Sequence, residues 1–145
     1  MKSLKHKFIN AILAASAYQA GADMVLHEHL RVDTLMVVSR NGRTLVFAGE
    51  VELTERHCLV NASRDLVDHK CHALLIVCVN NSVKDRVSTM ISRQMPAVVL
   101  PRIRICTAAK LSSQYISEWF DSQVYLGRVP QPSENNEEKG VSSRE

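Results

Sequence analysis

The sequence predicts a single α/β domain over residues 1–126, in which helices flank a mixed β-sheet. Hydrophobic residues make up 46% and charged residues 23% of the 145-residue chain, which are ordinary values for a globular protein. Segments with strand periodicity alternate with helical segments in the order α-β-β-β-α-β-α-β-α. From residue 127 the chain is poor in apolar residues and rich in Ser, Pro, Asn and Glu. We therefore expect residues 127–145 to form a disordered polar tail.

The first third of the chain predicts one helix followed by three strands. The helix covers residues 3–20 and ends at Gly21, because glycine readily adopts the left-handed conformation that follows a helix. Asn41-Gly42 favours a type I′ turn, which joins two strands into a hairpin. We expect the strands at residues 24–30, 32–39 and 44–53. The buried stripe of the helix is expected to contain Leu4, Phe8, Ile12 and Ala15.

The rest of the domain predicts three helices and two strands. Asn61 or Ser63 can cap a helix that runs to residue 70. The uninterrupted apolar run at residues 73–79 is typical of a strand that is covered on both faces. Pro101 interrupts the extended residues 97–106, which indicates an edge or bent strand. The other helices are expected at residues 82–95, capped by Asn81 or Ser82, and at residues 112–120.

The cysteines favour a reducing cytoplasm. None of the four belongs to a C-x-x-C pair, and Cys78 lies in the apolar run, so buried thiols are expected rather than zinc ligands or disulfides. The basic start and Ala15-Ser16-Ala17 also resemble a secretory signal, but Asn10 interrupts the apolar segment, and we favour the helix. No apolar run approaches the roughly 20 residues that span a membrane.

Three carboxylates converge at one end of the predicted hairpin. Asp33 opens the first arm, whereas Glu50 and Glu52 close the second arm on one shared face, since strand side chains alternate. Clustered carboxylates repel one another unless protons or a cation neutralise them. Hard oxygen ligands suit Mg²⁺ or Mn²⁺, so a divalent-metal site is one interpretation. The alternative is that all three are solvated residues at strand ends.

This arrangement resembles the PD-(D/E)XK nucleases, which include restriction enzymes, Holliday-junction resolvases and nuclease modules of mobile elements. Asp33 before the turn and Glu50-Val51-Glu52 after it carry the resemblance, which spans residues 5–79. It implies a restriction-endonuclease-like αβββαβ core and a metal-dependent endonuclease, a hydrolase of DNA phosphodiester bonds in a mobile-element or defence system. By resemblance, Asp33, Glu50 and the backbone carbonyl of Val51 would bind Mg²⁺ or Mn²⁺, and Glu52 would position or deprotonate water.

The chain departs from the family pattern where a lysine is usual, because Glu52 stands in that place. Arg64 or Lys70 in the following helix could supply the missing positive charge, and Glu28 could add a carboxylate. The alternative function is a catalytically inactive module of the same fold that binds nucleic acid or a partner protein. The resemblance also implies dimerisation to cut two strands, and the sequence leaves DNA and RNA open as targets.

The basic residues fit either nucleic-acid binding or a plain solvated surface. The net charge is +3, and the tail carries one more acidic than basic residue, which leaves about +4 on the domain. His27 and His29 share a face of their strand and could bind a metal or simply meet solvent. The expected contacts to the phosphate backbone are Lys5, Lys7, Arg31, Arg43 and Arg56.

Overall fold

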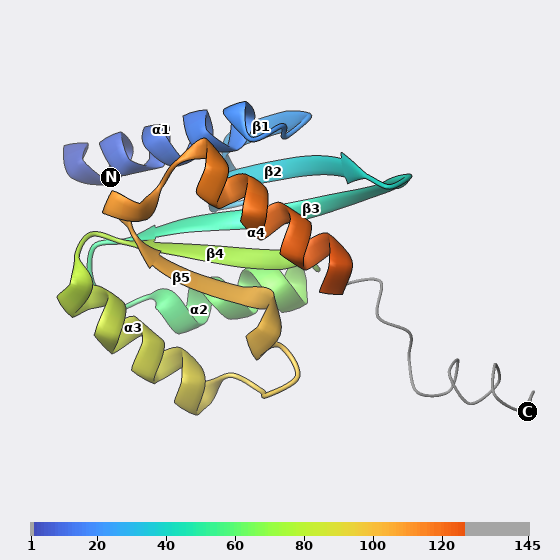
Figure 1. The fold of residues 1–145 in the computed structure, drawn as a ribbon. Helices are drawn as coiled ribbons and strands as arrows, with labels where there is room; N and C mark the ends of the chain where they lie inside the picture. Colours follow the sequence, from blue (N-terminus) through green and yellow to red (C-terminus); the bar gives the residue numbers. More distant parts are fainter. Residues whose placement is uncertain (1, 127–145) are drawn as a thin grey trace, which may run out of the picture.

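The computed structural model describes residues 2–126, and the predicted tail lies outside this range. A five-stranded mixed sheet has helices on both faces (Figure 1). The predicted order of elements is confirmed. The helices are α1 (Leu4–Gln19), α2 (Cys58–Ser63), α3 (Asn81–Gln94) and α4 (Ser113–Leu126). The strands, which neighbour one another in sequence order, are β1 (Met24–His29), β2 (Val32–Arg40), β3 (Arg43–Glu52), β4 (Ala73–Cys78) and β5 (Ile103–Thr107).

The sheet separates two hydrophobic cores. One core packs α1 and α4 against the sheet, and the other packs α2 and α3 against the opposite face (Figure 1). Phe47 lies at the centre of the first core, with its ring centroid 5.1 Å from that of Trp119 and 5.2 Å from that of Phe120. Every residue of β4 is buried, as its continuous apolar sequence predicts.

The hairpin register brings Asp33 and Glu50 to one end of the sheet. Asn41 and Gly42 both have positive φ, as a type I′ turn requires, and the pairing runs from Arg40–Arg43 to Thr34–Gly49. β4 and β5 run parallel to β3, so their carboxyl ends meet there too. In Figure 1 this end also holds the start of α1.

The buried stripe predicted for the first helix is wrong. Leu4 is 83% exposed and Phe8 is 64% exposed, and Ala15 also faces solvent. The helix turns its other side inward because polar residues on that side bind β2: the Asn10 side chain donates to the backbone carbonyl of Asp33 at 3.0 Å. The buried face contains His6, Ile9, Asn10, Leu13, Ala14, Ser16 and Ala17.

Other boundaries also differ from prediction. α2 begins at Cys58 and continues as a π-helical turn over Arg64–Asp68, and Asn61 does not cap it because its side chain bonds elsewhere. Asn80 caps α3 by accepting the Val83 N–H at 2.9 Å. Residues 97–100 form turns, so only β5 is a strand there, at the sheet edge as predicted.

All four cysteines are buried free thiols. None of the helices within residues 2–126 is long and apolar enough to cross a bilayer.

Candidate functional site

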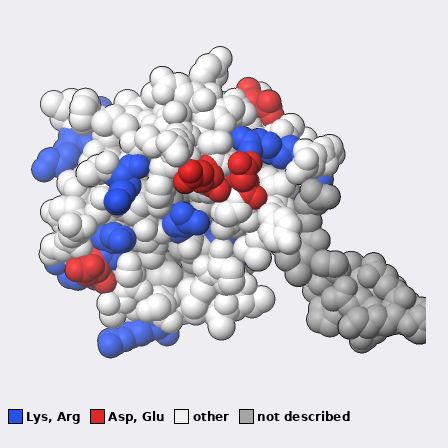
Figure 2. Space-filling view, viewed as in Figure 1, with Lys and Arg blue, Asp and Glu red and all other residues white. Residues whose placement is uncertain are grey.

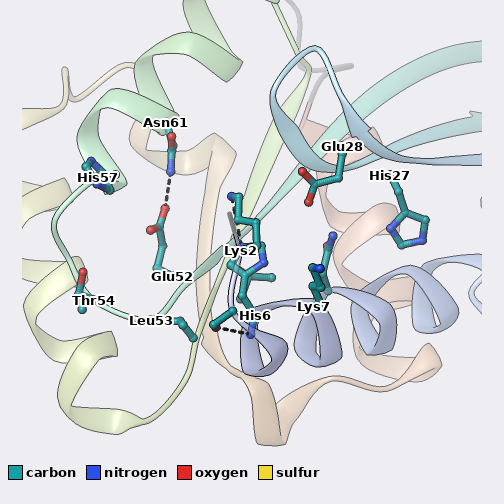
Figure 3. Close-up of a pocket in the computed structure, with 13 residues that line it drawn as sticks. Lys2, His6, Lys7, His27, Glu28, Glu52, Leu53, Thr54, His57 and Asn61 are labelled. Atoms are coloured by element: carbon teal, nitrogen blue, oxygen red, sulfur yellow. Dashed lines mark hydrogen bonds between the residues drawn. The ribbon is translucent and has the colours of Figure 1, made fainter.

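A cleft of about 980 Å³ opens at the carboxyl end of β3 (Figure 3). The start of α1 forms one wall, β1 a second, and the segment from the end of β3 into α2 a third. Ligand sites favour the carboxyl ends of parallel strands, because chain segments diverge there and leave a crevice. The polar lining includes Lys2, His6, Lys7, Glu28, Glu52 and Asn61.

Asp33 is the most heavily bonded carboxylate of this region. It is 2% exposed and lies where β2 and β3 separate, beyond the Thr34–Gly49 pair. Its Oδ2 accepts the Val51 N–H at 2.8 Å and lies 3.0 Å from His6 Nε2. Its Oδ1 accepts from Lys2 Nζ at 2.9 Å. These three contacts hold the carboxylate in one orientation.

Glu50 is 1% exposed and faces the second core, beside the π-helical turn. Arg64 Nη2 donates to Glu50 Oε2 at 2.6 Å, and Arg64 Nε donates to Asp65 Oδ1 at 3.0 Å. Burial is the largest cause that raises the pKa of Glu50. Its hydrogen bond to Asp65 and the negative charges of Asp65 and Asp33 raise the pKa further, and these effects outweigh the opposing charge of Arg64. Asp65 Oδ2 has no partner within the described residues, and a proton on Glu50 would satisfy it. Glu50 and Asp65 therefore lie buried against a single guanidinium, that of Arg64.

Glu52 faces the cleft and is 5% exposed. Its Oε2 accepts from Asn61 Nδ2 at 2.8 Å, the bond drawn in Figure 3. Burial raises the pKa of Glu52 to about 7, and the charge of Asp33 adds to this effect, whereas the Asn61 bond and Lys2 oppose it. A carboxyl group with a pKa near neutrality can both take up and release a proton at physiological pH.

Lys2 supplies positive charge beside Asp33, a role predicted for Arg64 or Lys70. Burial lowers its pKa, but the hydrogen bond and charge of Asp33, with the charges of Glu28 and Glu50, outweigh this effect and raise it. Arg64 also supplies positive charge to the carboxylates, because it forms an ion pair with Glu50. Lys70 does not contact the carboxylates. It precedes the amino end of β4, where the first residue pairs with Phe47, whereas Glu50 and Glu52 lie toward the carboxyl end of that strand.

The geometry divides the three predicted carboxylates. Asp33, Glu50 and Glu52 are all buried at one end of the sheet, but Glu50 is directed to Arg64 and Glu52 to Asn61. The one group of three His, Cys, Asp or Glu side chains within residues 2–126 whose ligand atoms lie within 4.8 Å of one another is His6, Glu28 and Asp33. This donor set, next to Val51 in the cleft wall, fits a divalent cation at Asp33.

The structure places the predicted nucleic-acid contacts in three regions. Lys7 lines the cleft, and exposed Lys5 and Arg56 lie at the same end of the sheet. Arg31 lines a second cavity of about 770 Å³ beside α2. Arg43 lies at the hairpin turn, seven residues along β3 from Glu50, so the structure does not bring it to the cleft. Figure 2 shows lysines and arginines dispersed over the face viewed there, with acidic residues between them.

Sequence reasoning missed His6, Asn61 and Lys2 as site residues. His27 lines the cleft, whereas the exposed His29 does not. Lys2 precedes the N-cap residue Ser3, and His6 lies in the first turn of α1. Both side chains reach Asp33. The apolar stripe predicted on the opposite side of the helix indicated the wrong buried face.

Comparison with known proteins gave no match: no protein family, curated protein or solved structure is significantly similar to this chain. Functional inference therefore depends on the geometry of the cleft.

Proposed function

We propose that this protein is a divalent-metal-dependent nuclease that hydrolyses phosphodiester bonds in DNA. The observation that carries the proposal is the burial of Asp33, Glu50 and Glu52 at one end of the sheet. Glu52 lines the cleft there with Lys2 and Lys7. Carboxylates withdrawn from water are costly unless they are paired or bind a cation. A bound divalent cation can activate water and neutralise charge on a phosphate, and the lysines can bind the phosphate backbone.

The fold supports the same proposal. Three antiparallel strands follow the first helix, and a fourth runs parallel to the third after a helical crossover. This is the αβββαβ order of the restriction-endonuclease-like core that the D…ExE pattern implies. By this resemblance, Asp33 and Glu50 would correspond to the residues with which that family binds its metal ion.

The proposed chemistry assigns a distinct task to each group. Asp33, with Glu50 once Arg64 releases it, would hold Mg²⁺ or Mn²⁺, which when bound would lower the pKa of a water and neutralise charge on the phosphate. Glu52, with its pKa of about 7, accepts the proton of the attacking water. Lys2 offers its ammonium to a phosphate oxygen, and Lys7 binds the phosphate backbone at the cleft wall.

A second candidate function is a non-catalytic module that binds nucleic acid or a partner protein. The favouring observation is that two carboxylates are already neutralised within the protein, Asp33 by Lys2 and Glu50 by Arg64. A site that satisfies its own charges has less need of an ion. In either function, a homodimer would let two clefts address two strands.

The test is cleavage of supercoiled, linear and branched DNA, and of RNA, in Mg²⁺ and in Mn²⁺. The test variants are Asp33→Asn and Glu50→Gln, which preserve side-chain size. Asp85→Asn is the matched control, since Asp85 is exposed on α3. Circular dichroism verifies that each variant folds, and gel filtration reports the oligomeric state.

The nuclease predicts metal-dependent cutting that the first two variants lose and the control keeps. DNA binding without cutting, equal in all four proteins, favours the binding module. Cutting of RNA alone would change the substrate and keep the mechanism. Neither binding nor cutting of any nucleic acid would contradict the nuclease and the nucleic-acid-binding module, and would leave only a module that binds a partner protein.

A further inference from the structure

We infer that the metal centre includes the imidazole of His6 together with Asp33 and Glu28, and that it therefore selects a first-row transition-metal ion over Mg²⁺. The inference deepens the proposed function and rests on it for the use of the ion. Ion binding itself can be measured without DNA. The expected ligand pair of the resemblance, Asp33 and Glu50, contains no nitrogen donor.

The three side chains lie at the spacing of metal ligands. His6 Nε2 is 3.0 Å from Asp33 Oδ2, and the ligand atoms of His6, Asp33 and Glu28 all lie within 4.8 Å of one another. Ligands held at about 2.1 Å from one ion lie roughly 3 to 4 Å apart. Binding an ion therefore needs only a small adjustment of the exposed Glu28 side chain.

The backbone directs Glu28 into the cleft. Glu28 has a φ of 52°, in the left-handed region that a glutamate rarely adopts. The β1–β2 register pairs His27 with Thr34 and His29 with Val32, but skips the residue between. In Figure 3 the Glu28 side chain points from β1 toward the start of α1, where Lys2 and Lys7 lie.

His6 is buried with one ring nitrogen toward the carboxylate. The residue is 5% exposed, and its Nδ1 has no hydrogen-bond partner within the described residues. Its Nε2 faces Asp33 at the wall of the cleft. The ring therefore presents Nε2, and not Nδ1, to Asp33, where it can join Asp33 as a ligand of one ion.

Lys2 lies next to this group. Its Nζ lies 2.9 Å from Asp33 Oδ1, yet its side chain is 46% exposed. The ammonium can therefore return to solvent when a divalent cation replaces it. Because the two cations compete for one carboxylate, removing the lysine charge should strengthen ion binding.

The donor set determines the class of ion. Mg²⁺ prefers oxygen ligands and retains its waters, whereas imidazole suits first-row transition-metal ions. One imidazole with two carboxylates therefore favours Mn²⁺ and the divalent ions that follow it in the first transition-metal row. Mn²⁺ is the probe of choice, since it resembles Mg²⁺ in charge and geometry and differs in its acceptance of nitrogen.

The experiment is calorimetric titration of the full chain with Mn²⁺ alone and with Mg²⁺ alone. We expect one Mn²⁺ site, with Mg²⁺ binding at least about tenfold more weakly. His6→Gln, which keeps a donor toward Asp33, should weaken Mn²⁺ binding by about tenfold or more, as loss of a metal-site partner does, and should change Mg²⁺ binding far less. Glu28→Gln, at an exposed position, should also weaken Mn²⁺ binding.

Two further variants sharpen the test. His27→Gln is the matched control, because His27 lines the same cleft outside the group, and it should bind both ions as the unmodified chain does. Lys2→Gln should bind both ions more tightly. Thermal unfolding of each variant without metal verifies the fold, and Glu28→Gln tests the inference even if His6→Gln does not fold.

Equal affinity for Mn²⁺ and Mg²⁺ would overturn the inference. The inference would also be overturned if Glu50→Gln lost Mn²⁺ binding and Glu28→Gln kept it. That result would leave the proposed nuclease intact, with its ion between Asp33 and Glu50. Conversely, the expected binding pattern without DNA hydrolysis would support the metal centre and contradict the nuclease.

Discussion

Replacing Arg64 by methionine should strongly destabilise the protein, because this side chain balances two buried carboxyl groups. Arg64 donates to Glu50 at 2.6 Å and to Asp65 at 3.0 Å, and the carboxyl side chains are at most 2% exposed. Methionine preserves much of the packing volume but leaves negative charge without a partner. Removing one partner of a buried pair costs about 3 to 5 kcal/mol. We expect about 3 kcal/mol at pH 8, at the lower end of this range, because burial raises the pKa of Glu50 and a proton on Glu50 removes part of the unpaired charge.

Urea denaturation at pH 8 and pH 5 measures this effect. Acid should restore part of the lost stability, because protonated carboxyl groups no longer need the guanidinium. Arg86→Met is the matched control: Arg86 pairs with Glu55 on the surface, and loss of such a pair costs less than about 1 kcal/mol. If Arg64→Met and Arg86→Met lost the same small free energy, or if acid made no difference, the reasoning about a charge-balanced cluster would be refuted.

Three further predictions test other parts of the structure. Gly49→Ala should cost about 1 to 3 kcal/mol in urea denaturation, because its Cβ would lie 2.7 Å from Leu13 Cδ2 and crowd α1; an unchanged midpoint would contradict this packing. Without metal, the free energy of unfolding should fall by up to about 3 kcal/mol as pH rises from 4.5 to about 7, because the pKa of Glu52 is higher in the folded than in the unfolded protein. The Glu52→Gln variant should lack this contribution to the pH dependence. Mn²⁺ should raise the melting temperature of the unmodified chain but not of Asp33→Asn; a similar rise in both would place the ion elsewhere.

The hairpin and its carboxylates were predictable because local rules determine them. Asn41-Gly42 fixes the turn, the turn fixes the register, and the register brings Asp33 opposite Glu50. Strand alternation then places Glu52 on the same side as Glu50. The hypothesis that these residues are solvated strand-end groups is contradicted by their burial.

The inward face of α1 could not be predicted from its apolar spacing. Leu4 and Phe8 look like core residues, but the helix is oriented by Asn10 and His6, which bond to a strand more than 20 residues away. The π-helical turn after α2 likewise accompanies a tertiary contact, the ion pair between Arg64 and Glu50. Contacts between distant segments leave little trace in local sequence, and most of the polar partners of this site are of that kind.

The central claim is that Asp33 binds a divalent ion that the protein uses to hydrolyse DNA. The most direct measurement is the initial rate of plasmid cleavage by the unmodified chain and by Asp33→Asn as the Mn²⁺ concentration increases. We predict a rate that saturates with Mn²⁺ in the unmodified chain and no cleavage at any concentration in the variant. Equal rates in both proteins, or no cleavage by the unmodified chain at saturating Mn²⁺, would contradict the claim.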